Sequence, residues 1–417
     1  MTDTATGGGA ARPLSYPMPR EHPLRPPAEY AVLRAERPVQ RAVLPSGRPV
    51  WLVSRHDLVR QVLTDPRISI NRFHPGFPHL FRNVQSPTEQ VGQVRFNHSL
   101  IGRAFSVDGP EHAARKRLVV AEFTVKRVQQ LRPRVQRVVD EHVTDLLAQD
   151  RPADLVRHLS TPVPSRVISE LLGVPLADRP FFLEKTRFMV DQSSTVEQRQ
   201  AANSAVLGKI DEIVSLRERE PADDLLSRLV DKNRETGALS HDEIVGMATF
   251  LLISGFETTA NMISMGVLGL LENPEQRDRL VADPELAASA VDELLRYFSV
   301  SDPAGSRVAL EDVEVGGVVI PAGEGVIALA GSANWDDEVF AEPGSLDITR
   351  PEARKHLAFG HGAHQCLGLH LARLELEVVF GALFRRAPGL RLAVPVEELR
   401  YKHGANIYGV HEVPVTW

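Results

Sequence analysis

The sequence predicts a mainly α-helical protein with a small β region, and two observations lead to this fold class. Apolar residues recur at three- and four-residue spacing, which is typical of helices that bury one face. This periodicity covers the following segments: 111–120, 123–148, 221–230, 241–272 and 285–297. Strand-like runs are short and are confined to 49–54, 313–320, 325–330 and fragments near the C-terminus. Helices and strands therefore do not alternate as in a parallel α/β sheet.

The composition is that of a globular protein with a large core, with 43% hydrophobic and 24% charged residues. We find no linker and no internal repeat, so we expect one domain over 15–417 after a disordered tail at 1–14 that is small, polar and Gly-rich. A net charge of −6 without a basic stripe argues against nucleic acid as a partner. No secretory signal and no membrane-spanning stretch are expected, so the predicted location is cytoplasmic, without membrane binding.

Cys366 is the only cysteine in the chain, which excludes an internal disulfide and any Cys-rich zinc or iron–sulfur site. A lone thiol is most often a small buried hydrophobe, so its neighbours decide its role. Glycines at 360, 362 and 368 surround it and allow tight turns and close approach to a flat cofactor. A helix is expected to resume at Leu367. The thiol would then lie at a helix N-terminus, where the dipole favours the thiolate.

One predicted helix is longer than the rest. Ser240 and Glu243 have the spacing of a capping box, and no proline interrupts the pattern until Pro274. The helix would be roughly 45–50 Å long at 1.5 Å per residue. Its middle, 250–259, is apolar on nearly all sides but contains a glycine, a carboxylate and two threonines, which weaken or bend a helix. Such distortions often mark function; the alternative is ordinary core with a tolerated polar cluster.

The cysteine loop resembles the haem signature of the cytochrome P450 family, Phe-x-x-Gly-x-His/Arg-x-Cys-x-Gly, at every fixed position. The resemblance implies the helical P450 prism around one haem b, with Cys366 as the axial thiolate ligand of the iron. The loop residues implied to bind the cofactor are Phe359, Gly360, His364, Cys366 and Gly368. The structural alternative, an inert cysteine beside a turn, would not require these flanking matches.

Further matches to the family follow in the expected order along the chain. Glu293 and Arg296 are similar to the Glu-x-x-Arg pair that braces the core behind the haem, and their i,i+3 spacing places both on one helix face. The segments 333–336 and 346–350 resemble the meander before the cysteine loop. Trp335 replaces the arginine that is more usual there, which leaves the pairing of this segment open.

The resemblance also assigns polar roles around the haem. Its two propionates need cationic or hydrogen-bonding partners, and the matching residues are His112, Arg307 and His364. Lys116 stands where many bacterial relatives have arginine; lysine can neutralise a propionate but cannot hold it in a bidentate manner. In the long helix, the motif around Glu257 and Thr258 resembles the family's oxygen-activation motif. There the hydroxyl relays a proton and the carboxylate resupplies it from solvent.

The predicted function is monooxygenation of a mid-sized organic molecule by hydroxylation or epoxidation, in secondary metabolism. By resemblance, electrons would come from a ferredoxin and ferredoxin reductase to a monomeric enzyme, steered by a basic face. The expected substrate pocket contains Phe250, Ser254, Ser299, Val300, Asn406 and Ile407. Two alternatives stay open at this point. One is oxidative C–C or C–N coupling of an aromatic or peptide-derived substrate, and the other is a haem-thiolate sensor without turnover, which would not need Glu257 and Thr258.

Overall fold

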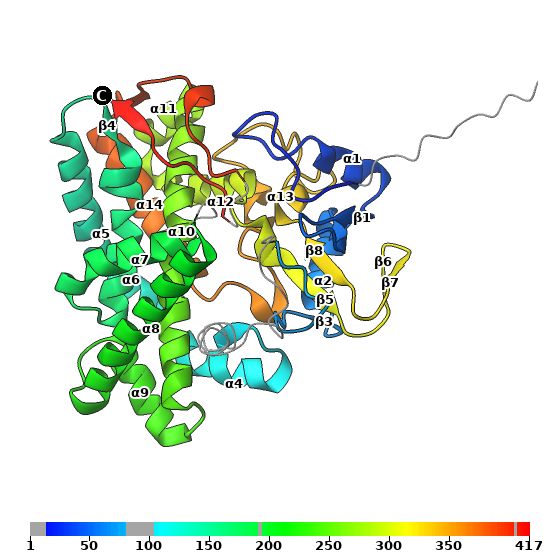
Figure 1. Cartoon of the computed structure of the whole chain (residues 1–417). Helices are drawn as coiled ribbons and strands as arrows, with labels where there is room; N and C mark the ends of the chain where they lie inside the picture. Colours follow the sequence, from blue (N-terminus) through cyan, green and yellow to red (C-terminus); the bar gives the residue numbers. More distant parts are fainter. Residues whose placement is uncertain (1–13, 81–103, 191–193, 404–406) are drawn as a thin grey trace, which may run out of the picture.

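A single long helix, α10 (His241–Glu272), passes through the centre of the helical part of the molecule (Figure 1). The computed structural model describes residues 14–80, 104–190, 194–403 and 407–417. The helix begins and ends where the sequence predicts. Its capping box forms in both directions between Ser240 and Glu243, and the chain restarts as α11 at Pro274. Local signals at both ends thus define this element.

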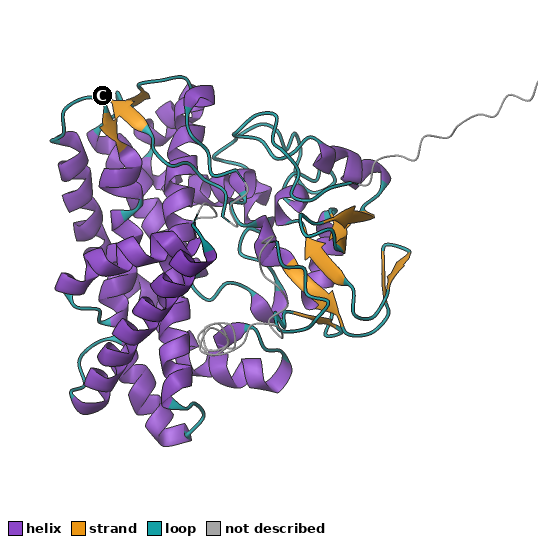
Figure 2. Ribbon diagram, viewed as in Figure 1, coloured by secondary structure: helices purple, strands orange, loops and turns teal. Residues whose placement is uncertain are grey.

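Helices α5 to α9, α11, α12 and α14 gather around α10 and form the larger part of the fold (Figures 1 and 2). Their shared core is one continuous cluster of buried side chains that runs from α5 to the C-terminal strand. The bounds of the other helices are α1 Glu29–Glu36, α2 His56–Thr64, α4 Gly109–Val119, α5 Val125–Leu147, α6 Pro162–Leu172, α7 Arg179–Val190, α8 Val196–Arg219, α9 Leu225–Thr236, α11 Pro274–Ala282, α12 Ala287–Phe298, α13 Ala330–Ala333 and α14 Leu369–Arg386.

The β part lies beside the helical part and is small (Figure 2). A five-stranded sheet has the order β1-β2-β8-β5-β3, a three-stranded sheet the order β4-β10-β9, and β6 pairs with β7. The strand bounds are β1 Val39–Val43, β2 Pro49–Val53, β3 Ile68–Ser69, β4 Ala153–Asp154, β5 Ser306–Ala309, β6 Val313–Val315, β7 Val318–Ile320, β8 Gly325–Ala328, β9 Arg391–Leu392 and β10 Pro414–Thr416.

Two predictions about elements need correction. The run 313–320 is a hairpin and not one strand, because Gly316 and Gly317 both have positive φ and turn the chain. Leu14, which we assigned to the tail, already belongs to the fold, since its carbonyl accepts a hydrogen bond from the Val43 N–H at 2.8 Å. Residues 1–13 lie outside the described part of the chain.

One helix in the described residues, α10, is long and apolar enough to cross a membrane by length and composition. We expected no membrane-spanning stretch, and this length and composition alone do not contradict that expectation. In fact, 78% of the most apolar window of α10 is buried inside the protein. The apolar composition of α10 is therefore explained by its place in the core.

Candidate active site

The loop that carries Cys366 is closed by a backbone hydrogen bond from the Cys366 N–H to the Phe359 carbonyl, at 2.9 Å. Gly360 and Gly362 make the turn possible, because their φ angles are +68° and +75°. The following helix, α14, begins at Leu369, two residues later than predicted. Cys366 therefore precedes the helix N-terminus, and the Gly368 N–H bonds to its sulfur.

The Cys366 side chain is exposed, yet burial raises the pKa of its thiol. The Gly368 hydrogen bond and the charges of Lys116 and Arg373 oppose this rise without cancelling it. The sulfur is thus accessible from one direction, while protein surrounds it at longer range. We conclude that the thiol lines a recess within the fold and does not lie on the outer surface.

A second accessible surface lies on α10, which is otherwise buried along most of its length. Phe250, Ser254 and Thr258 share one helix face at i,i+4 spacing. Ser254 is exposed, and Phe250 and Thr258 are half-buried. The Thr258 hydroxyl donates to the Ser254 carbonyl at 3.1 Å, a bond back to the preceding turn of the kind that bends helices. The centre of the core helix thus presents two hydroxyl groups and an aromatic ring to an accessible space.

Basic side chains from three elements gather at the cysteine loop: His112 and Lys116 from α4, His364 from the loop itself and Arg307 from β5. The rings of His112 on α4 and His364 lie 4.1 Å apart, and Lys116 donates to the Ala363 carbonyl at 2.8 Å. The Arg307 guanidinium on β5 is buried. Within the described residues it donates to two carbonyls of its own segment, those of Ala304 and Ser306. These are the four residues that the sequence assigns to the propionates, and the fold brings them together.

The charges of this cluster destabilise one another. Burial and the charge of Arg72 lower the pKa of Arg307 to about 10. Burial, His364 and Lys116 lower the pKa of His112 to about 4. Burial opposes ionisation of Asp108, but hydrogen bonds from His364 and Ser69 hold its pKa below the usual range. One carboxylate among several cations leaves the cluster short of negative charge, which suits the two carboxylates of a haem.

Glu257 has its partners on a different side of α10 from Thr258. Its Oε1 accepts from the Asn261 Nδ2 at 2.9 Å and from the Lys402 Nζ at 2.8 Å, and the residue is 9% exposed. Lys402 also donates to the Asn261 Oδ1 at 2.9 Å. The predicted carboxylate of the oxygen-activation motif is therefore ion-paired and not free.

The predicted substrate residues separate into three cases. Phe250 contacts Phe105 at 5.1 Å between ring centroids, and the Val300 carbonyl accepts from the Tyr408 N–H, next to half-buried Ile407. Asn406 lies outside the described residues. Ser299 is buried, its hydroxyl donates to carbonyls of the preceding turn, and it accepts from the Asn334 amide at 2.6 Å. These bonds turn the Ser299 hydroxyl toward the meander, and the assignment of Ser299 to the pocket stays a prediction.

The Glu-x-x-Arg pair is fully buried and has a third member. Glu293 accepts two hydrogen bonds at 2.7 Å from Arg296 and is also bonded by Arg350. The guanidinium of Arg296 donates to carbonyls of the meander, including Asn334 and Pro343. This network fastens α12 to the segment that leads into the cysteine loop.

Trp335, the residue that departs from the family pattern, finds a partner of its own. Its Nε1 donates to the Tyr297 carbonyl at 3.0 Å, and the two rings lie 4.9 Å apart. The tryptophan thus fastens the meander to the end of α12 by packing and one hydrogen bond. The pairing left open by the sequence is resolved in this way.

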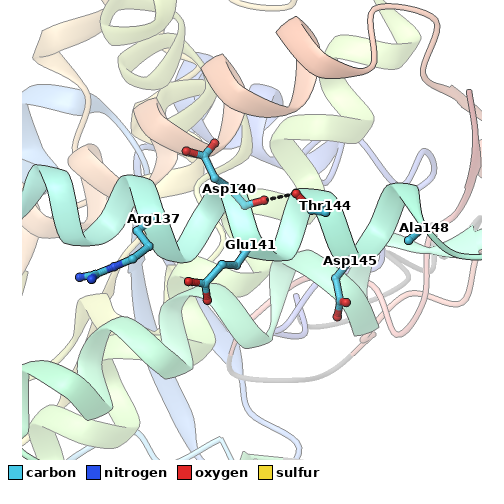
Figure 3. A pocket seen from close by; sticks show the side chains of 6 residues that line it. All are labelled: Arg137, Asp140, Glu141, Thr144, Asp145 and Ala148. Atoms are coloured by element: carbon cyan, nitrogen blue, oxygen red, sulfur yellow. Dashed lines mark hydrogen bonds between the residues drawn. The ribbon is translucent and has the colours of Figure 1, made fainter.

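A surface depression of about 510 Å³ lies far along the chain from these residues, on the outside of α5 (Figure 3). It is lined by Arg137, Asp140, Glu141, Thr144, Asp145 and Ala148. The Thr144 hydroxyl is already bonded to the Asp140 carbonyl at 2.7 Å. Because the depression is open and shares no residue with the site above, we assign it no role.

Comparison with known proteins identifies the family. A family model described as cytochrome P450 matches residues 191–387. The chain is 44% identical over 418 residues to the vitamin D3 dihydroxylase of Streptomyces griseolus, covering 100% of both chains. The chain belongs to the cytochrome P450 family. Its fold also matches the crystal structures of P450 MoxA from Nonomuraea recticatena (48% identity, TM-score 0.87, 97% and 98% coverage) and of CYP105P1 in complex with filipin I (42%, 0.89, 97% and 99%).

As a P450, the protein is an oxidoreductase with a haem iron cofactor, a small-molecule substrate, dioxygen and redox partners. The predicted P450 fold and the monooxygenase class are confirmed, which argues against the sensor alternative. The residues present fit the cofactor, because a single accessible thiol faces a recess beside a cluster that lacks negative charge. In the described part of the chain, no group of three His, Cys, Asp or Glu side chains could hold a metal instead.

Three residues of the site were missed by sequence reasoning. Arg72 is exposed, yet burial lowers its pKa, as expected for a side chain that lines a recess. Its charge also lowers the pKa of Arg307. Lys402 and Asn261 surround Glu257. Asn261 could have been found from its i,i+4 spacing to Glu257. Arg72 and Lys402 carry no local signal, since tertiary folding alone brings them to the site.

Proposed function

We propose that this P450 inserts oxygen into a mid-sized, largely apolar secondary metabolite, with haem b bound through the thiolate of Cys366. The observation that carries the proposal is the accessible but desolvated thiol in a loop that matches the haem signature. Bound haem supplies the oxidising chemistry, in which dioxygen is activated with two electrons and two protons. All other steps below belong to side chains of this chain.

The protein residues bind and orient the cofactor. The Gly368 N–H donates to the sulfur of Cys366, which moderates how strongly the thiolate donates electrons to the iron. Lys116 and Arg307 would neutralise the two propionates, and His112 and His364 would hydrogen-bond them. The excess of positive charge there favours binding. Phe359 supports the loop through a contact with Arg373, whose guanidinium carbon lies 5.0 Å from the centroid of the Phe359 ring. Together these residues would hold the cofactor.

Thr258 and Glu257 are proposed to deliver protons. The Thr258 hydroxyl lies on the accessible face of α10, where it would hold a proton at Oγ1 for delivery into the site. The Glu257 carboxyl exchanges protons with solvent and resupplies the hydroxyl. Phe250 and its partner Phe105 cover one end of this face.

The substrate is proposed to lie along Phe250, Ser254, Val300 and Ile407, a mixture of aromatic, aliphatic and hydroxyl groups. Such a surface suits a mid-sized, largely apolar molecule with a few polar groups. The similar proteins are consistent with this class, because one is named for dihydroxylation of vitamin D3 and another is seen in complex with filipin I. Asn406 is retained as a candidate beside Ile407.

We further propose that a ferredoxin and its reductase supply the electrons to a monomeric, cytoplasmic enzyme. Arg117, Lys126 and Lys355 are exposed and could steer an acidic partner. Arg115 does not belong to this set, because it is buried and ion-paired with Glu111 and Glu243 at 2.8 and 2.7 Å. Charge reversal at Lys126 should slow reduction by ferredoxin in a salt-dependent manner.

The decisive experiment replaces Cys366, since the chain has no other thiol. We expect Cys366→Ser either to lose haem or to lose the thiolate-type absorption of the reduced carbon monoxide complex. Retention of that absorption would refute the assignment. A library of apolar natural products, screened by the shift of the haem Soret band, would then identify ligands. Labelled dioxygen distinguishes the outcomes, because a coupled product without label would favour oxidative coupling.

A further inference from the structure

The chain before α1 contains a segment without helix or strand that nonetheless holds buried side chains. We call residues 14–25 the N-terminal strap; Figure 1 shows it as the dark blue loop beside α1. Tyr16 and Met18 belong to the core cluster that includes β1 and β2, whereas Leu24 belongs to the core of the helical part. The strap therefore crosses from one part of the fold to the other.

The strap holds Tyr408, which lies near the other end of the chain, in two ways. The Tyr408 hydroxyl donates to the Pro23 carbonyl at 3.0 Å. The guanidinium carbon of Arg20 lies 4.0 Å from the centroid of the Tyr408 ring, within the range of a cation–π contact. Arg20 is itself held, because it donates to the Arg25 carbonyl at 2.6 Å. Both the ring and the hydroxyl of Tyr408 are thus fixed by the strap.

Tyr408 in turn positions two residues of the proposed pocket. Its N–H donates to the Val300 carbonyl at 2.7 Å. This N–H belongs to the peptide unit that joins Ile407 to Tyr408, and a peptide unit is planar. The bond therefore fixes the backbone of Ile407 relative to that of Val300. Neither residue lies in a helix or a strand, so no regular ladder performs this task.

The segment of Val300 is fastened at a second point. Asp302 accepts from the Tyr30 hydroxyl at 3.0 Å and from the Gly331 N–H. Its carboxylate is buried, and a Cβ atom at position 331 would lie 2.8 Å from both of its oxygens. Tyr16 of the strap hydrogen-bonds to Tyr30. The strap thus acts on the turn after α12 at both Val300 and Asp302.

Fastening the start of the chain would not require these contacts. The strap is already joined to the sheet, where the Tyr16 N–H donates to the Val43 carbonyl at 3.0 Å and the Val43 N–H donates to the Leu14 carbonyl at 2.8 Å. The bonds of Tyr408 lie elsewhere and end on the backbone of the proposed pocket. Two loops that face a ligand lose affinity when they are free to move apart, because the binding-competent arrangement is then less populated.

We propose that the N-terminal strap is a specificity element that sets the spacing of Val300 and Ile407 through Tyr408. Arg20 and Tyr408 are positioning residues, which act on the substrate through these two walls of the pocket. The ligand concerned is the mid-sized, largely apolar substrate of the proposed function, and the inference rests on the placement of that substrate along Val300 and Ile407.

The test compares two ligands of the haem iron, imidazole and clotrimazole, in the haem-loaded enzyme. Both bind iron through an imidazole nitrogen and shift the Soret band, but only clotrimazole carries bulky aryl rings that reach the pocket walls. The ratio of the two dissociation constants therefore reports on the walls and not on the iron. Tyr408→Phe removes the bond to the Pro23 carbonyl, and Arg20→Met removes the charge over the ring.

We expect each variant to weaken clotrimazole binding by about fivefold, because the walls are no longer held in one arrangement. Imidazole binding should stay within about twofold of the wild type. Arg20→Lys retains a cation over the ring and should keep the wild-type ratio. If the ratio stays at the wild-type value in both Tyr408→Phe and Arg20→Met, or if clotrimazole binds them more tightly, the proposal is overturned.

Two matched controls separate this role from general stability. Tyr401→Phe removes a hydroxyl that also donates to a backbone carbonyl, that of Val396 at 2.9 Å. Arg151→Met removes a guanidinium whose carbon lies 4.6 Å from the centroid of the Trp417 ring. Both controls lie outside the strap, so they should lower the free energy of unfolding as the strap variants do but leave the ratio unchanged. An equal change of the ratio in the controls would also overturn the proposal.

The two proposals fail in different ways. If clotrimazole binds the wild type no more tightly than imidazole does, the aryl rings gain nothing from the pocket, and the proposed apolar pocket is wrong together with the strap. If the wild type prefers clotrimazole and the strap variants prefer it equally, the role of the strap alone is wrong. Should Tyr408→Phe lose haem, Tyr30→Phe, which loosens the same turn at Asp302, takes its place with the same expected ratio.

Discussion

The buried ion cluster of Glu293 offers a sharp test of how this fold is held together. Glu293→Gln keeps the size of the side chain but removes its charge. The carboxylate is 0% exposed and accepts hydrogen bonds from Arg296, Arg350 and the Asp347 N–H. The glutamine amide would place a donor against one of these donors, and two buried guanidinium groups would lose their counter-ion.

The structure sets the size of the effect. Breaking a buried pair by removing one partner costs about 3–5 kcal/mol, because the remaining charge is buried without compensation. Here two arginines share one carboxylate, but both also donate to backbone carbonyls of the meander, such as Ser345. We therefore expect about 3 kcal/mol, the lower end of that range. Against a total stability of about 5–15 kcal/mol, such a loss is large.

The measurement is urea unfolding of the haem-loaded protein, followed by circular dichroism and by the Soret band. Because cofactor loss can precede unfolding, both signals are needed. Asp231→Asn is the matched control, since Asp231 and Arg234 have the same i,i+3 spacing on a helix but are more than half exposed. The control should change the free energy of unfolding by at most about 1 kcal/mol. Equal shifts in the two variants would refute the reasoning.

Two further predictions concern function and pH. Thr258→Ala should bind haem normally but lower coupled product formation by on the order of 10²-fold, the contribution of a positioned proton donor. Thr249→Ala is its control, because that hydroxyl makes the same bond to the preceding turn in a buried position; equal coupling in both would exclude the role. Hydrogen bonds from His241 to Glu218 and Asp211 raise its pKa. Its stabilising contribution is therefore complete below about pH 6.5 and is lost as pH rises through the higher folded value. The free energies of unfolding of His241→Gln and of the wild type, measured in urea, should converge at high pH and differ by about 1 kcal/mol or less at low pH. A pH-independent difference would contradict this.

Local sequence signals predicted the elements whose ends are chemically marked. The bounds of α10 follow from a capping box at Ser240 and a proline at 274, both of which act within one turn of the helix. The cysteine loop was predicted for a similar reason, since Gly360 and Gly362 are needed wherever φ is positive. The same rule applied to Gly316 and Gly317 would have predicted the β6–β7 hairpin that was taken for one strand.

Contacts between distant segments could not be predicted from local pattern. Ser299 is one of the predicted pocket residues, but the direction of its side chain is set by a left-handed backbone (φ 35°) and by Asn334, 35 residues away. Arg350 joins Glu293 across 57 residues. Arginines and lysines are most often solvated, so a sequence gives no reason to select one of them as a buried partner.

Glu257 shows where the limit of local inference affects the mechanism. The motif predicts an acid and an alcohol in sequence, and both are present on α10 as expected. It does not reveal that the acid is paired with an ammonium 145 residues later in the chain. A motif specifies which groups are available for proton transfer, whereas the fold specifies the charge and direction in which each is held at rest. In this P450 the acid of the motif is ion-paired with Lys402 at rest, an arrangement that the motif alone does not specify.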